Sequence, residues 1–463
     1  MTSETFDAVI LGTGQAGKPL AGALAEAGHT VAIVERELVG GSCVNYGCTP
    51  TKTMLASAYV AHLATHAERW GVRTGDVEVD LAAVVDRKRR VVEGFRQSSR
   101  RGLEEADGVE LVFGHGRLTG PRTVEVALED GGRRELAARS WVFLNTGTRP
   151  RLPELEGIED VPTLDNTTVM ELEEAPEHLL VLGGGYIGCE LGQMFRRFGS
   201  AVTVIQRGPR LVGREDADVS DGLAEVLRAD GVEVLLDAET GRAERAGGGV
   251  ALTVAQPGGE RRLAGSHLLV ATGRTPNTVD LGLDAAGVAT DERGYVTVND
   301  RLETGVPGIY ALGDVNGGPA FTHVSYDDFR VVERNLLGDG GGSRAGRPVP
   351  YVLFTDPQLG RIGLGEEDAR ERGLDVRVAK LPMNNVARAI ETGETRGFMK
   401  AVVEAGSGKI LGCAVLGREG GEAMTVVQVA MMGGLPYTAL RDGVFAHPTL
   451  AESLNNLFSR IDG

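Results

Sequence analysis

Short apolar runs that end in glycine recur along the chain and predict strands buried on both faces. Ala8–Leu11 and His178–Leu182 are such runs. Each is followed by a helical pattern and a second apolar run, Thr30–Glu35 in the first case and Ala201–Ile205 in the second. Continuous apolar runs of this length are typical of parallel strands, because helices cover both of their faces. The pattern therefore predicts an α/β fold that contains two β-α-β units.

Glycines at a fixed spacing lie between the first strand and the helix of each unit. Both units carry G-x-G-x-x-G, formed by Gly12, Gly14 and Gly17 and again by Gly183, Gly185 and Gly188. Such glycines let the backbone approach a pyrophosphate at a helix N-terminus, where free N–H groups favour negative charge. Glu35 closes the first unit, where an acid accepts hydrogen bonds from a ribose. We expect two Rossmann-like dinucleotide sites, and hence electron transfer between two cofactors.

The second unit ends differently from the first. Gln206 stands where an acid would hold the ribose of NAD, and cations follow at Arg207, Arg210 and Arg214. A site with cations and no acid accommodates a 2′-phosphate, so we expect NADPH to be favoured, with NADH possible. The alternative is that these arginines are only solvated surface charge.

Size and charge narrow the class of protein. At 463 residues the chain exceeds one ordinary core, so two to four domains are expected. Its 48 basic and 65 acidic residues give a net charge of −17, which repels nucleic acid and anionic lipid, and we expect neither as a partner. No apolar run reaches the roughly 18 residues of a membrane span. No leader pattern precedes the first strand, so a cytoplasmic protein is the simplest interpretation.

Two of the four cysteines lie five positions apart in the segment 40–52, GGSCVNYGCTPTK. Five residues of a regular helix rise about 7.5 Å, whereas a disulfide needs Cα atoms roughly 4.4–6.8 Å apart. Gly47 adds flexibility, and Pro50 disfavours helical angles in the residue before it. We expect a helix with an irregular start, where Cys43 reaches Cys48 as a redox-active disulfide and the helix dipole stabilises a nearby thiolate. The alternative is two reduced, buried cysteines that only pack.

These motifs resemble, in order and over nearly the whole chain, those of the FAD-dependent pyridine nucleotide–disulfide oxidoreductases. That family includes glutathione reductase, dihydrolipoamide dehydrogenase and mercuric reductase. The segments 321–330 and 351–365 are most similar to the mercuric reductase-like branch. The resemblance implies two Rossmann-like domains, a C-terminal α+β dimerisation domain and a homodimer. The implied boundaries are 1–148 with 268–346 for FAD, 149–267 for NAD(P) and 347–463 for the interface.

The resemblance also implies roles for single residues. Cys48 would lie against the flavin as the charge-transfer thiolate, and Cys43 would be the interchange thiol that attacks substrate. Lys52 and Glu190 would form an ion pair beside the flavin, and the Tyr186 ring would cover the nicotinamide pocket. Helix surface for Lys52 and helix packing for Tyr186 are the alternatives.

Three strand-to-turn passages carry further candidate cofactor contacts. Asp314 follows Gly313 at the end of a short buried strand, where an acid can hydrogen-bond the polyol of a ligand. Gly147 in the segment 145–150 and Gly273 in the segment 271–277 lie in similar passages, where we expect the chain to cross between domains. We assign Gly147 and Asp314 to FAD and Gly273 to NADP.

One of the eight histidines lies in a setting suited to proton transfer. His447 precedes Pro448, and Glu452 follows at the start of a helical pattern. A histidine base needs a partner that fixes its tautomer and stabilises the imidazolium, and a carboxylate does both. In the family this histidine comes from the other subunit and exchanges a proton with the interchange thiol; a capping or packing histidine is the alternative. The apolar segment 420–435 suits the dimer interface that such a site requires.

The expected reaction is hydride transfer from NADPH to FAD, opening of Cys43–Cys48, and exchange with a small-molecule disulfide, or the reverse oxidation of a dithiol. The alternatives are a mercury, copper or quinone reductase, a flavin-based redox sensor, and a dehydrogenase without flavin. Mercury is disfavoured because no cysteine pair lies near the C-terminal end and no N-terminal metal-binding domain precedes the first strand. No resident metal is expected, and Cys189 and Cys413 should be small buried hydrophobes.

Overall fold

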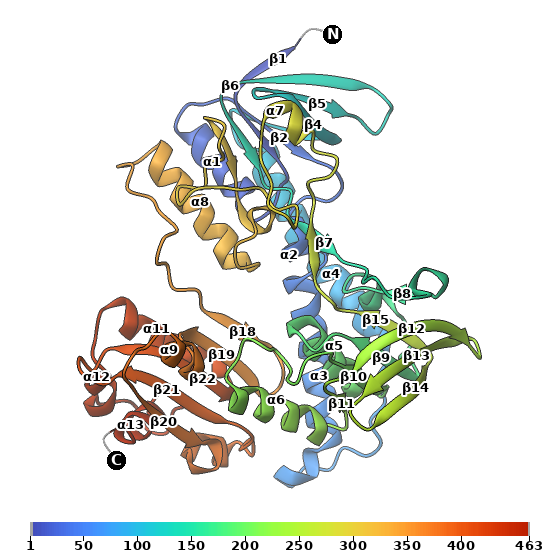
Figure 1. Cartoon of the computed structure of the whole chain (residues 1–463), viewed down its shortest axis with the longest axis vertical. Helices are drawn as coiled ribbons and strands as arrows, with labels where there is room; N and C mark the ends of the chain where they lie inside the picture. The colour runs from blue at the N-terminus through green and yellow to red at the C-terminus, as the bar shows by residue number, and fades with distance from the viewer. Residues whose placement is uncertain (1–2, 462–463) are drawn as a thin grey trace. The chain divides into compact units, whose positions relative to one another are not determined.

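The computed structural model describes residues 3–461, and the chain forms two compact units (Figure 1). Unit 1 comprises Met1–Thr53, Asp86–Arg151 and Gly273–Arg347, and unit 2 comprises Met54–Val85, Leu152–Thr272 and Pro348–Gly463. The chain thus leaves unit 1 after Arg151 and returns at Gly273, next to the two passages where the sequence predicts a crossing. The three-domain boundaries inferred from the resemblance stay a prediction.

Unit 1 is built on a mixed seven-stranded sheet with the order β3-β2-β1-β6-β5-β4, and β17 also pairs with β6. The parallel part consists of β1 (Glu4–Leu11), β2 (Val31–Glu35), β3 (Val109–Phe113), β6 (Arg133–Leu144) and β17 (Ile309–Ala311). The antiparallel part consists of β4 (His115–Gly120) and β5 (Thr123–Ala127), and β7 (Thr148–Pro150) pairs separately with β16 (Arg274–Pro276). Its helices are α1 (Gly17–Glu26), α2 (Gly41–Asn45), α7 (Leu283–Ala286), α8 (Thr322–Leu336) and the 3-10 turn η4 (Gly313–Asn316); α3 (Cys48–Thr65) and α4 (Leu81–Glu104) contribute to both units.

The first apolar run is buried on both faces, as its sequence predicts. Ala8 and Ile10 pack into the cluster that contains residues of α1 and α8. Val9 and Leu11 pack into a second cluster formed with β4, β5 and α7. Each of these four side chains is at most 2% exposed, so the alternation of a strand places successive apolar residues in different layers.

Unit 2 begins with a parallel five-stranded sheet, order β11-β10-β9-β15-β8. Its strands are β8 (Thr163–Leu164), β9 (His178–Leu182), β10 (Ala201–Ile205), β11 (Glu233–Leu235) and β15 (His267–Val270), with helices α5 (Tyr186–Arg197) and α6 (Ala217–Ala229). An antiparallel sheet follows, formed by β12 (Glu239–Ala246), β13 (Gly249–Gln256) and β14 (Gly259–Gly265). Because β1-α1-β2 and β9-α5-β10 are both parallel crossovers, the two predicted Rossmann-like units are confirmed.

The C-terminal part of unit 2 is an antiparallel sheet, order β18-β19-β22-β21-β20. Its elements are β18 (Tyr351–Leu353), β19 (Gln358–Gly363), β20 (Val376–Pro382), β21 (Phe398–Glu404), β22 (Ile410–Gly417), α9 (Glu366–Glu371), α10 (Ala387–Glu391), α11 (Gly420–Met432), α12 (Tyr437–Asp442) and α13 (Ser453–Ser459). This is the α+β arrangement expected for the C-terminal domain. Cys413 in β22 and Cys189 in α5 are fully buried, and burial raises the pKa of each thiol to about 12, so both are inert packing residues.

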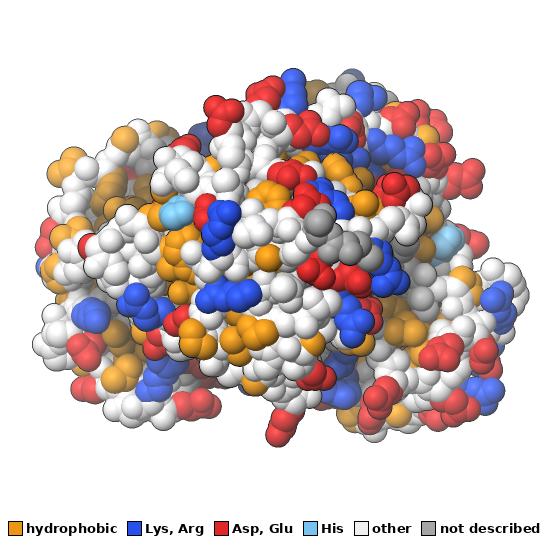
Figure 2. Space-filling model, turned by 90° about the horizontal axis from the view of Figure 1, so that it is seen from above, with side chains coloured by type: hydrophobic (Ala, Val, Ile, Leu, Met, Phe, Trp, Pro, Cys, Tyr) orange, Lys and Arg blue, Asp and Glu red, His pale blue; other side chains and the backbone are white. Residues whose placement is uncertain are grey.

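Charges of both signs are interspersed on the face drawn in Figure 2. Among residues 3–461, no helix is long and apolar enough to cross a membrane.

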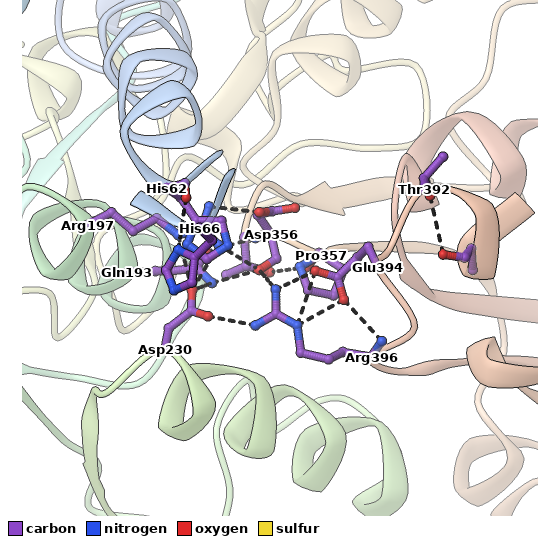
Figure 3. Close-up of polar contacts among 12 residues, drawn as sticks. His62, His66, Gln193, Arg197, Asp230, Asp356, Pro357, Thr392, Glu394 and Arg396 are labelled. Atoms are coloured by element: carbon purple, nitrogen blue, oxygen red, sulfur yellow. Dashed lines mark hydrogen bonds and ion pairs between the residues drawn. The ribbon is translucent and has the colours of Figure 1, made fainter. Parts of the chain in front are cut away.

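A buried network of charged side chains joins the two parts of unit 2 (Figure 3). Arg197 of α5 binds Asp230 at 2.9 Å and Asp356 at 2.8 Å, and Arg396 binds Asp230 at 2.6 Å. The side chains of Arg197 and Asp230 are only 6% and 4% exposed. Burial and the neighbouring Arg197 lower the pKa of His62 to about 4, so this imidazole is neutral at pH 7. Asp230 is the carboxylate that the two arginines share, while Asp356 pairs with Arg197 alone and Glu394 with Arg396 alone.

Asp230→Asn should destabilise the protein by about 3–5 kcal/mol, because it leaves two arginines without their shared counter-charge. Burial raises the pKa of Asp230, but Arg197 and Arg396 outweigh it and hold the pKa below its ordinary value. Its stabilising contribution is thus present above about pH 4 and fades as the pH falls. Urea unfolding measures the change, with Asp339→Asn as the control, because Asp339 pairs with Arg334 on the open surface. Equal, small shifts for both variants would contradict a structural role for the network.

Candidate redox and nucleotide-binding sites

Glycines and Asn145 hold the start of α1 against the end of β1. Gly12 has a φ of +100°, and a Cβ there would collide with the Asn145 carbonyl; one at Gly17 would collide with the Gly12 carbonyl. Asn145 Oδ1 accepts a hydrogen bond from Gly17 N at 2.9 Å, and Asn145 Nδ2 donates to Leu312 O at 2.8 Å. The first turn of α1 therefore begins at the carboxyl edge of the parallel strands, where a pyrophosphate binds in such folds.

Glu35 and Gln206 occupy equivalent positions in the two β-α-β units. Glu35 ends β2, and its Oε2 accepts a hydrogen bond from Thr13 N at 3.1 Å. Gln206 follows β10, and its Oε1 accepts a hydrogen bond from Gly184 N at 2.9 Å. Thr13 and Gly184 each come directly after the first glycine of their fingerprint. The second site thus carries an uncharged amide where the first carries a carboxylate.

The second fingerprint leaves space at its central glycine. Gly183 has a φ of +114°, and a Cβ at Gly188 would collide with the Gly183 carbonyl. An added Cβ at Gly185 would meet no atom within 4 Å. In dinucleotide folds this glycine is the one whose backbone approaches the pyrophosphate, so the open space fits that ligand.

The three arginines after Gln206 differ in their surroundings. Arg207 and Arg214 are exposed. Arg210 Nη1 lies 3.0 Å from a Glu367 carboxylate oxygen. An arginine already paired with a carboxylate is a weaker phosphate ligand, so Arg207 and Arg214 are the better candidates for a 2′-phosphate.

Asp314 lies in the turn η4 and is half-buried. Thr148 Oγ1 donates to Asp314 Oδ2 at 3.1 Å, and burial raises the pKa of Asp314. Asp328 of α8 holds this turn in place. It accepts a hydrogen bond from Gly313 N at 2.8 Å and forms an ion pair with Arg347 at 2.7 Å. A carboxyl group held in this way suits hydrogen bonds with ligand hydroxyls.

Gly147 and Gly273 both adopt positive φ, at +66° and +123°. An added Cβ at either position would meet no atom within 4 Å. Each backbone carbonyl is used: Gly147 O accepts from Asn277 N and Gly273 O accepts from Arg151 N, both at 3.0 Å. Their open faces fit a nearby ligand, and their contact with FAD and NADP remains a prediction.

The cysteine pair lies beside the first fingerprint. Cys43 is in α2, Cys48 begins α3, and the break between the helices at Tyr46–Gly47 is the irregular helix start that the sequence predicts. An added Cβ at Gly41 would lie 2.8 Å from Gly14 Cα, and Gln15 Nε2 donates to Gly40 O at 3.1 Å. Through these contacts the start of α2 packs against the first fingerprint turn at Gly14 and Gln15.

The two thiols are neighbours across the break between α2 and α3. A hydrogen bond between Cys43 and Cys48, together with burial, raises the pKa of Cys43. The lowered thiol pKa expected at the helix start stays a prediction for Cys48, where α3 begins, whereas the pKa of Cys43 is raised. The cause is that its proton is held by the neighbouring sulfur, so attack by Cys43 requires a base.

Thr322 is a site residue that the sequence did not predict. Its Oγ1 lies 3.1 Å from Cys48 Sγ, and its hydroxyl also lowers the pKa of Cys43, against the larger effect of Cys48. Thr322 is the first residue of the 15-residue helix α8. Asn145, directly after β6, and Asp328, in α8, were not predicted as site residues either.

Thr322→Val should slow disulfide reduction about fivefold at neutral pH, because one hydrogen bond to the thiol pair is lost. Without the hydroxyl the pKa of Cys43 rises further, so the loss should shrink as the pH increases. Thr322→Ser keeps the hydroxyl and serves as the matched control. A loss that is independent of pH, or equal in the two variants, would show that the hydroxyl does not act on the thiols.

The remaining candidates divide between the two units. His447 and Glu452 of unit 2 form the expected pair, with Nδ1 at 2.8 Å and 3.0 Å from the two carboxylate oxygens, and the His447 side chain is 68% exposed. Glu190 is buried in unit 2, where its Oε1 accepts from Phe354 N at 2.8 Å. Lys52 belongs to unit 1, and its ion pair with Glu190 stays a prediction.

A dithiol beside one dinucleotide turn, a second dinucleotide turn, and a histidine–carboxylate pair define the class of a nucleotide-dependent thiol–disulfide oxidoreductase. The family model "Pyridine nucleotide-disulphide oxidoreductase" matches residues 6–328, and the dimerisation domain of the same family matches residues 349–458. The chain belongs to the pyridine nucleotide–disulfide oxidoreductases, a family that depends on FAD and uses pyridine nucleotides.

Similar proteins align with almost the whole chain. The probable pyridine nucleotide-disulfide oxidoreductase RclA of Escherichia coli is 37% identical, over 98% of this chain and 99% of its own length. A mercuric reductase of Streptomyces lividans is 36% identical over 97% and 94%, and a dihydrolipoyl dehydrogenase of Thermus scotoductus is 36% identical over 97% and 96%. The solved Cu(II) complex of RclA, an HOCl-induced flavoprotein disulfide reductase, superposes with a TM-score of 0.90 and covers 99% of both chains. The chain is therefore an oxidoreductase that acts on sulfur groups.

Proposed function

We propose that the protein uses NADPH to reduce a small-molecule disulfide through Cys43 and Cys48. The observation that carries the proposal is the placement of both cysteines at the break between α2 and α3, beside the first fingerprint turn. Glu35, the half-buried Asp314 and the open face of Gly147 fit FAD at that turn. Bound FAD supplies the means to carry an electron pair from the nicotinamide to the disulfide.

The thiol chemistry follows from the surroundings of the two sulfurs. His447 of a partner subunit accepts the Cys43 proton, because the raised pKa of Cys43 disfavours the thiolate. The thiolate attacks one substrate sulfur, a mixed disulfide forms, and His447 protonates the first leaving thiolate. Cys48 then attacks Cys43, which releases the second thiol and restores the internal disulfide. The net change is one disulfide, NADPH and a proton converted into two thiols and NADP⁺.

A homodimer would complete this site, since the base is expected to come from the other subunit. Helix α11 and the segment after it present exposed apolar side chains, Val429 at 61%, Met432 at 70% and Leu435 at 46%. Large exposed apolar residues on one segment are typical of an interaction surface. They support burial of this segment between two copies.

The preference for NADPH rests on Gln206 and Arg207. Arg207→Ala should lower kcat/KM for NADPH about tenfold or more, because a charge-assisted hydrogen bond to the 2′-phosphate is lost. The kcat/KM for NADH should stay within twofold of its value in the unaltered protein. Arg262→Ala is the control, since Arg262 is an exposed arginine paired with Glu244. An equal loss with both nucleotides would remove Arg207 from the phosphate site.

The proposed function is tested by NADPH oxidation against a panel of disulfides, including glutathione disulfide, cystine and a mycothiol-type disulfide. Turnover of one disulfide with two thiols formed per NADPH supports it. Chelated Cu(II) and Hg(II) form a second arm, because a related flavoprotein disulfide reductase was solved as a Cu(II) complex. Metal-dependent turnover with no disulfide turnover would favour the second candidate, a metal-ion reductase. Flavin that NADPH leaves oxidised would overturn both.

A further inference from the structure

Tyr186 is tied to a residue from the C-terminal sheet of unit 2. It is the first residue of α5, directly after Gly185, at the carboxyl end of β9 where ligands bind in such sheets. Its side chain hydrogen-bonds Tyr351 at the start of β18, and the two ring centroids lie 5.5 Å apart. Tyr186 is therefore not simply a packing residue of α5.

The contact continues into a buried ion pair. The Tyr351 hydroxyl donates to Glu215 Oε1, and Glu215 Oε2 faces Arg361 Nε at 3.7 Å. Glu215 and Arg361 are 2% and 3% exposed. A phenol has one proton to donate. The Tyr351 hydroxyl therefore bonds Glu215 and also contacts the Tyr186 hydroxyl, which links the Tyr186 side chain to the buried ion pair.

Burial keeps both tyrosine hydroxyls protonated. It raises the pKa of Tyr186 and of Tyr351, so both stay neutral phenols that can donate. Among the described residues, Glu215 Oε2 and Arg361 Nη1 make no hydrogen bond. The Tyr351 hydroxyl is thus the side-chain donor that satisfies the Glu215 carboxylate, and losing it would leave a buried carboxylate poorly partnered.

We propose that Tyr351 and Glu215 are positioning residues that fix the Tyr186 ring for binding of the reduced nicotinamide nucleotide. The proposal rests on the proposed function, in which Tyr186 covers the nicotinamide pocket. A ring without its anchor samples further rotamers. The binding-competent fraction then falls and the apparent Kd for the nucleotide rises by the same factor. Exchange between the dithiol and substrate does not involve this ring and stays unchanged.

The test is a double-mutant cycle on flavin reduction by NADPH, followed by rapid mixing without a disulfide. Tyr351→Phe and Tyr186→Phe each remove the same hydrogen bond, so each should lower the ratio of reduction rate to Kd about fivefold. The double variant should be no slower than either single one. Tyr437→Phe, which removes a hydroxyl from a buried tyrosine of α12 in the same unit, should leave the ratio within twofold.

Losses that multiply in the double variant, or a Tyr351→Phe variant equal to the unaltered protein, would overturn the proposal. If Tyr351→Phe does not bind FAD, Glu215→Gln and Glu215→Leu give the same comparison. Glu215→Gln keeps an acceptor oxygen for Tyr351, so its ratio of reduction rate to Kd should stay within twofold of the unaltered protein. Glu215→Leu removes that oxygen, so its ratio should fall about fivefold. These outcomes are distinct from failure of the proposed function, in which NADPH would not reduce the flavin of the unaltered protein at all.

Discussion

Cys43→Ser should lower NADPH-dependent disulfide turnover by more than about 10³-fold, as expected when a covalent nucleophile is removed. Cys43 is the partly buried thiol of the pair, in α2, which packs against the fingerprint turn. Cys48→Ser should be equally damaging, because the mixed disulfide would not be resolved. Steady-state oxidation of NADPH with the disulfide identified from the panel measures both losses.

The two serine variants should still bind FAD, and NADPH should still reduce it, since neither change touches the nucleotide fingerprints. Cys413→Ala removes a fully buried thiol far from the pair in sequence and should leave turnover within twofold. Serine variants that keep a tenth or more of the activity would contradict a covalent role for the pair.

His447→Ala should be the second most damaging change, with a loss of about 10²–10⁴-fold in disulfide turnover. The carboxylate of Glu452, 2.8 Å from Nδ1, leaves the other ring nitrogen free to exchange a proton with a thiol. Added imidazole should restore part of the activity of the alanine variant, and it should not help His115→Ala in β4. A small loss, or no rescue, would return His447 to the role of a capping or packing residue.

The local patterns predicted the parallel units closely, because each depends on neighbouring residues. The run before Gly12 alternates between two core layers, so it had to be apolar throughout. The spacing of Cys43, Gly47 and Cys48 required a helix break, and the break lies at Tyr46–Gly47. Cys189 and Cys413, which lack any motif, are packing residues.

Contacts between distant segments could not be read from the sequence. Thr322 reaches Cys48 across 274 positions, and Asn145 reaches Gly17 across 128. The direction of the Cys43 pKa shift also depends on a contact between side chains, which a helix-dipole argument does not include. Likewise, the position of Arg210 in the sequence predicts a phosphate ligand, but in the folded protein Arg210 forms an ion pair with Glu367.

Alkylation of Cys43 and Cys48 before and after NADPH addition tests the central claim most directly. The oxidised, FAD-loaded protein is treated anaerobically with one equivalent or more of NADPH, alkylated, digested and analysed by mass spectrometry. We predict that the peptide spanning the two cysteines is linked before NADPH and carries two alkyl groups afterwards, while the modification of Cys189 and Cys413 is unchanged. A peptide in the same state before and after NADPH, with the flavin reduced, would contradict electron transfer through Cys43–Cys48.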